Sequence, residues 1–92
     1  MLFWLFCWYK WLGRQIAWNI ADESNVDNFE VQRSTDTSSG NFVSITTISA
    51  KSNAQTNSYS YLDSGSISTD IFYYRLKMVD KDGATSYSIR WL

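Results

Sequence analysis

The sequence predicts an all-β domain built as an antiparallel sandwich of two sheets with six or seven strands. Short segments alternate apolar and polar residues, and polar turn segments separate them roughly every 10–15 residues, close to the spacing of a β-sandwich. No window of the sequence shows the period of an amphipathic helix. The chain has 92 residues, of which 45% are hydrophobic, so we expect one domain with its own core.

Residues 1–14 form an atypical aromatic leader, MLFWLFCWYKWLGR, that is nearly all apolar through Tyr9. No basic residue precedes the apolar run and no small-residue cleavage pattern follows it, so we predict no signal peptide. The run is also shorter than the roughly 20 residues that span a bilayer. Three interpretations stay open: an edge strand, a misassigned start, or an interfacial anchor held by Trp and Tyr. We expect membrane contact least of the three.

Residues 15–92 are predicted to form the sandwich itself. In its first segment, Ile16, Trp18 and Ile20 share one face at period two, as in a half-buried strand. The segment 42–49 is rich in β-branched residues but does not alternate cleanly, so we expect a β-bulge there. The predicted strands are 15–20, 29–33, 42–49, 58–63, 71–79 and 84–92.

The stretch DKDG, residues 80–83, has two possible interpretations. Asp80 and Asp82 could bind Ca²⁺ or transfer protons, but a calcium loop of the EF-hand type needs more oxygen ligands and a closing Glu. Asp and Gly both tolerate positive φ, and Asp-Gly pairs favour tight turns. We therefore predict that Asp80, Asp82 and Gly83 form a hairpin turn.

The strand before this turn carries Arg75 and Lys77 on the face opposite Leu76 and Met78. The two cations suggest a site for an anionic ligand. However, Glu30 lies on the matching outward face of an expected neighbouring strand, and opposite charges on paired strands contribute roughly 0.2–1 kcal/mol. We therefore favour a face whose charges neutralise one another.

The composition argues against an enzyme. Histidine is absent, so no serine has the usual base to activate it. The single cysteine, Cys7, lies in an apolar run and is expected to be buried and inert. With 8 basic and 9 acidic residues the chain has no basic field for nucleic acid. We predict no catalytic residue, cofactor, metal or nucleic-acid partner.

Three segments, in order, resemble one family: WNIADESN, FEVQRS and YYRLKMVDKDG. This pattern is similar to fibronectin type III-like modules of secreted and surface proteins from Bacteroidetes-type bacteria, and it covers residues 16–88. In those proteins the module commonly precedes a sorting domain of the type IX secretion system. The resemblance implies an immunoglobulin-like sandwich, an extracellular or cell-surface location, and a spacer or interaction role beside neighbouring domains.

The resemblance also implies structural roles for individual residues. Trp18 matches a tryptophan that packs between the sheets, and Tyr74 matches the tyrosine whose hydroxyl ties a loop back to the strand. Two departures stand out: the segment SGSISTDIF lacks the proline usual before this strand, and no sorting domain follows Leu92. The implied core positions are Trp18, Phe29, Val31, Tyr74, Leu76 and Met78.

A second functional hypothesis is a module that binds a carbohydrate, a peptide or a surface protein. Aromatic rings are 17% of the chain, and such rings form binding faces for sugars and peptides. A small sandwich also needs rings for its core, so only a few are free to face a ligand. The candidates are Tyr73, Trp91 and the leader tryptophans Trp4, Trp8 and Trp11.

Overall fold

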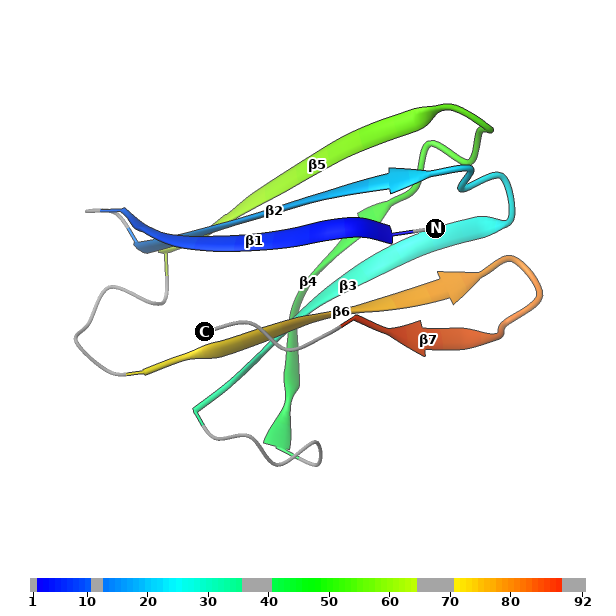
Figure 1. Ribbon diagram of the computed structural model, residues 1–92. Coiled ribbons are helices and arrows are strands. Elements are labelled where there is room, and N and C mark those ends of the chain that lie inside the picture. The colour runs from blue at the N-terminus through cyan, green and yellow to red at the C-terminus, as the bar shows by residue number, and fades with distance from the viewer. Residues whose placement is uncertain (1, 11–12, 36–40, 65–70, 89–92) are drawn as a thin grey trace.

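The computed structural model describes residues 2–10, 13–35, 41–64 and 71–88 (Figure 1). The described residues form seven β-strands and no α-helix. The strands are β1 (Leu2–Lys10), β2 (Gly13–Ala21), β3 (Val26–Ser34), β4 (Val43–Ser49), β5 (Thr56–Asp63), β6 (Tyr73–Asp80) and β7 (Thr85–Tyr87).

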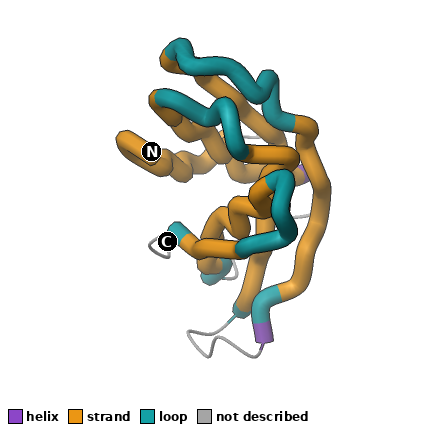
Figure 2. The backbone as a smooth tube through the Cα atoms, turned by 90° about the vertical axis from the view of Figure 1, so that its right-hand side faces the viewer, coloured by secondary structure: helices purple, strands orange, loops and turns teal. Residues whose placement is uncertain are grey.

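The strands make two antiparallel sheets, one with the order β1-β2-β5 and the other with the order β4-β3-β6-β7. Figure 2 shows the two sheets as separate layers, and the buried apolar residues of both sheets form one core. The prediction of an all-β fold with two antiparallel sheets is therefore confirmed. Residues 2–10 of the leader form an edge strand, and the backbone of Cys7 lies opposite Ile16 of β2.

Most strand boundaries lie one to three residues from their predicted positions, and β2 already begins at Gly13, within the predicted leader. β6 begins at Tyr73 rather than at residue 71, and Phe72 instead packs against the edge of the core. The final described strand is Thr85–Tyr87, and the predicted continuation beyond residue 88 lies outside the described residues. The expected bulge is confirmed, because Val31 pairs with Thr46 and the next residue of β3 pairs with Ser44.

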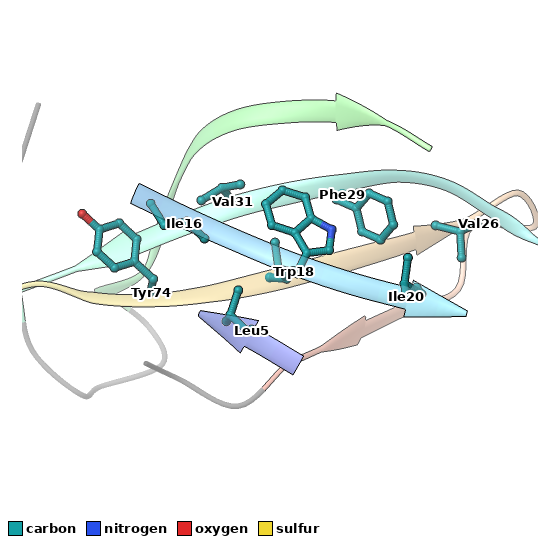
Figure 3. Packing of buried hydrophobic residues seen from close by; sticks show 9 residues of the cluster. Leu5, Ile16, Trp18, Ile20, Val26, Phe29, Val31 and Tyr74 are labelled. Carbon is teal, nitrogen blue, oxygen red and sulfur yellow. The ribbon is translucent and has the colours of Figure 1, made fainter. Parts of the chain in front are cut away.

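Aromatic rings from both sheets meet in the middle of the core (Figure 3). Trp18 of β2 lies edge-on to Phe29 of β3, with ring centroids 5.7 Å apart. Tyr59 of β5 stacks on Trp18 at 5.6 Å and tilts against Phe29 at 4.9 Å. Aromatic pairs at such separations contribute about 0.5–1.5 kcal/mol beyond their buried area. The rest of the buried apolar core is Leu5, Ile16, Ile20, Val26, Val31, Tyr74 and Leu76.

The residues singled out by the resemblance lie in or beside this core. Trp18, Phe29, Val31, Tyr74 and Leu76 are all buried. Met78 is half-buried and packs against the core from the end of β6.

Glycine is required where β2 starts. Gly13 has a φ of +133°, and a Cβ at this position would overlap the backbone carbonyl of Asp63 on β5. Gly83 also has a positive φ, +90°, but a Cβ there would meet nothing within 4 Å. A side chain at Gly13 would therefore cause both backbone strain and steric overlap, whereas a side chain at Gly83 would cause backbone strain alone.

We predict that Gly13→Ala lowers the free energy of unfolding by about 3 kcal/mol, because strain and overlap add. Gly83→Ala should cost only about 1 kcal/mol, because it adds strain alone. Urea unfolding of both variants measures the difference. Equal losses would show that Gly13 does not lie against β5 as described.

Candidate functional site

Polar and aromatic side chains gather on the outer side of the four-stranded sheet. The strand register places Gln32 of β3 between Ser44 of β4 and Arg75 of β6. One row further along, Glu30 lies opposite Lys77, and Lys77 lies opposite Tyr87 of β7. We call this surface the arginine face; its members are Glu30, Gln32, Phe42, Ser44, Arg75, Lys77 and Tyr87.

Arg75 is held between two aromatic rings at the centre of the arginine face. Its guanidinium carbon lies 4.4 Å from the ring centroid of Phe42 and 4.2 Å from that of Tyr87. Phe42 comes from the β4 side of the sheet and Tyr87 from the β7 side, so the rings bracket the cation. Its Nε donates a hydrogen bond to Oε1 of Gln32 at 2.6 Å. Ring contacts and this hydrogen bond together fix the plane of the guanidinium.

A relay of hydrogen bonds continues from Arg75 across the sheet. Nε2 of Gln32 donates to Oγ of Ser44 at 3.1 Å, and this hydroxyl donates to Glu30. The hydrogen bond from Ser44, supported by the positive charge of Lys77, lowers the pKa of the Glu30 carboxyl below its ordinary value. Glu30 is therefore held as a carboxylate within the face.

The prediction that charges on this face neutralise one another holds for Lys77 but not for Arg75. Lys77 pairs with Glu30, with Nζ 3.7 Å from Oε2. Arg75 does not pair with Glu30, because the neutral amide of Gln32 lies directly opposite it on β3. Within the described ranges, no carboxylate contacts Arg75. Among the residues that the structure describes, Arg75 is therefore a cation of this face without a carboxylate partner.

A buried carboxylate, Glu23, lies at one end of the sandwich. Its side chain is inaccessible to solvent, and the Tyr59 hydroxyl lies 2.7 and 2.6 Å from its two oxygens. Nδ2 of Asn57 donates to Oε1 at 2.7 Å, and the backbone N–H of Ser52 donates to Oε2 at 3.3 Å. Glu23 thereby fixes the connection between β4 and β5 to the connection between β2 and β3. The burial of Glu23 was not expected, because the segment ADESN has the composition of a solvated turn.

A second buried carboxylate, Asp63, ends β5 near the opposite end. Nη1 of Arg33 lies 2.9 and 2.7 Å from its two oxygens, and the Tyr74 hydroxyl donates to Oδ2 at 2.6 Å. The Tyr74 hydroxyl thus ties the start of β6 to the end of β5 through a side-chain carboxylate. Asp63 lies four positions after Tyr59, the partner of Glu23, along β5, which is about 13 Å of strand. Both carboxylates act as internal structural anchors.

The turn after β6 uses its acidic residues for its own hydrogen bonds. The backbone N–H of Gly83 donates to the carbonyl of Asp80 at 2.9 Å. Oδ1 of Asp82 accepts from the N–H of Ala84 at 3.0 Å. Across residues 2–10, 13–35, 41–64 and 71–88, no group of three or more His, Cys, Asp or Glu side chains could hold a metal ion.

The exposed rings are not those that the sequence singled out, apart from Trp8. Tyr73 is half-buried; Trp11, Trp91 and the side chain of Trp4 lie outside the described part of the chain. The side chains of Phe6 and Trp8 on β1 are 46% and 44% exposed, and Tyr87 is 51% exposed. The exposure of Phe6 could have been predicted from the alternation along β1, because Phe6 lies on the same face of the strand as Trp8.

Cys7 lies between these two rings in sequence but is half-buried. Burial raises the pKa of its thiol from 9.0 to about 11, against a smaller opposing effect of Arg14. Such a thiol is almost wholly protonated near neutral pH, as the expectation of an inert cysteine requires.

Among the residues that the structure describes, no helix is long and apolar enough to cross a bilayer.

Comparison with known proteins identifies similar folds only. No protein-family model matches the chain, and no curated protein matches it. Two crystal structures of pectate lyase Pel3 from Pectobacterium carotovorum are similar over 94% of the chain, with TM-scores of 0.69 and 0.63. The sequence identities are 17% and 18%, so the likeness concerns the fold alone. The chain spans about a quarter of the length of those lyase chains, 25% and 24%.

Tyr59 allows a test of the Glu23 anchor by pH. Burial, and then the hydrogen bond to Glu23, raise the pKa of its hydroxyl from 10.0 to about 12. A raised pKa in the folded state means that the neutral hydroxyl stabilises the fold below pH 10, and that this stabilisation is lost as the pH rises through about 12.

We predict that Tyr59→Phe lowers the free energy of unfolding at pH 8 by roughly 1–3 kcal/mol, because it removes a donor from a buried carboxylate. The variant should also lose less stability than the unmodified chain between about pH 10 and 12. Urea unfolding across this range measures both effects, with Tyr61→Phe on the same strand as the control. Identical pH profiles for the two variants would contradict the anchor.

Proposed function

We propose that this chain is a non-catalytic, fibronectin type III-like β-sandwich module that acts as a spacer or interaction domain within a larger secreted or cell-surface bacterial protein. The order of strands is the observation that carries this proposal. Immunoglobulin-like sandwiches, whose architecture fibronectin type III domains share, divide seven antiparallel strands between a sheet of four and a sheet of three. The sheets β1-β2-β5 and β4-β3-β6-β7 have the same arrangement.

The comparison with larger proteins supports a role as one part of an assembly. The fold of this chain is found in about a quarter of a pectate lyase chain. A sandwich of this kind therefore occurs beside other structure within one polypeptide. The proposed origin in a Bacteroidetes-type protein handled by type IX secretion rests on the segments WNIADESN, FEVQRS and YYRLKMVDKDG.

The placement of charged side chains is also consistent with a non-catalytic module. Glu23 and Asp63 are buried among hydrogen-bond donors, and the Asp82 carboxylate accepts a hydrogen bond within its turn. General acid–base catalysis needs a group within reach of a substrate. These three carboxylates are instead occupied in holding the chain in place.

Binding of a carbohydrate or a peptide is the second candidate function. The specific observation in its favour is the exposure of Phe6, Trp8 and Tyr87 on the outer sides of the two sheets. Tyr87 also lies against Arg75, a cation with no carboxylate partner in the described part of the chain. Exposed rings beside a positioned polar group are typical of ligand-binding surfaces.

We predict that the full chain unfolds in a single cooperative transition and has no lyase activity on polygalacturonate. Urea unfolding, and the ultraviolet absorbance of unsaturated products, measure the two properties. Turnover that disappears in Arg75→Gln but persists in Lys81→Gln would contradict the non-catalytic proposal. Lys81 is a suitable control because it is an exposed cation in the turn after β6.

A further inference from the structure

We infer that the arginine face binds a uronate, a sugar unit that bears a carboxylate, with Arg75 holding the carboxylate and Tyr87 packing against the sugar ring. This inference rests on the second candidate function, carbohydrate binding, and specifies its ligand and its residues. Three features of the described side chains carry it: the open edge of Arg75, its lack of a charged partner, and the exposed ring beside it.

The first feature is the edge of Arg75 that is formed by its two Nη atoms. Phe42 and Tyr87 bracket the guanidinium, and its Nε bonds to Gln32. The edge formed by the two Nη atoms has no hydrogen-bond partner among the described residues. Two parallel N–H groups in one plane match the two oxygens of a carboxylate. A ligand carboxylate can therefore approach in the plane of the guanidinium.

The second feature is that the positive charge of Arg75 is available. The nearby acid, Glu30, is engaged by Ser44 and Lys77. The partner of Arg75 on the neighbouring strand, Gln32, is neutral and is itself held by Ser44. The side chain of Arg75 is thus oriented before any ligand arrives, which reduces the entropic cost of binding.

The third feature is the exposed ring of Tyr87. Tyr87 contacts Arg75 and still has 51% of its surface exposed, so part of its ring faces solvent. Sugar rings pack their apolar C–H faces against such rings. A uronate carries a carboxylate directly on a ring of this kind. A neutral sugar lacks the charge, and an acidic peptide side chain lacks the ring, so a uronate fits both groups best.

The test is a titration of the full chain with trigalacturonate, followed by amide chemical shifts in NMR spectra. We expect shifts on β3, β6 and β7 and binding in the millimolar range or tighter, at low salt. The methyl ester of the same trisaccharide should bind at least about tenfold more weakly, because it keeps the ring but loses the charge that Arg75 recognises.

Variants then assign the effect to Arg75. Arg75→Gln should weaken binding of trigalacturonate at least about tenfold. Arg75→Lys keeps the charge but loses the planar fork, and should weaken binding by roughly three- to tenfold. Lys81→Gln makes the same change in net charge away from the arginine face and should stay within about twofold. Circular dichroism checks that each variant is folded. If Arg75→Gln does not fold, the loss of affinity in Arg75→Lys still tests the role of Arg75.

Several results would overturn the inference. They are the absence of binding, equal binding of the methyl ester, an equal loss in Lys81→Gln, or tighter binding of a glutamate-rich peptide than of trigalacturonate. None of these results bears on the module proposal, which depends on cooperative unfolding and on the lack of turnover. The failure of one proposal is therefore distinguishable from the failure of the other.

Discussion

The contact between Trp18 and Phe29 across the core is the interaction on which the rest of the structure depends. Trp18 lies on the middle strand of the three-stranded sheet, and Phe29 lies on an inner strand of the four-stranded sheet. A domain of this size buries only about 60–65% of the surface of its unfolded chain. Each fully buried ring supplies roughly 4–6 kcal/mol of transfer free energy, and the net stability of a domain is only about 5–15 kcal/mol.

Tyr59 connects this core to the end of the sandwich. The ring of Tyr59 stacks on Trp18, and its hydroxyl donates a hydrogen bond to the buried carboxylate of Glu23. At the other end, Asp63 joins β5 to β6 through the hydroxyl of Tyr74. Hydrogen-bonded carboxylates therefore fix both ends of the described interior, and the exposed aromatic rings of the described residues lie on the outer sides of the two sheets.

The parts of this fold that follow local alternation could be predicted from the sequence. The period of two along Ile16, Trp18 and Ile20 identified a strand and its buried face. The pair between Glu30 and Lys77 followed from the same parity on neighbouring strands. The burial of Glu23 could not be predicted, because its partners Asn57 and Tyr59 lie 34 and 36 residues further along the chain. The bracketing of Arg75 also depends on distant segments, since Phe42 precedes β4 and Tyr87 ends β7.

A double-mutant cycle between Trp18→Phe and Phe29→Leu, measured by urea unfolding, tests the central contact most directly. Our account predicts a coupling free energy of about 0.5–1.5 kcal/mol, because each substitution disturbs the same pair of rings. The cycle of Trp18→Phe with Lys81→Gln, in the exposed turn, should be additive within about 0.3 kcal/mol. If the cycle between Trp18 and Phe29 were equally additive, the two sheets would not be joined through these rings, and the account would be contradicted.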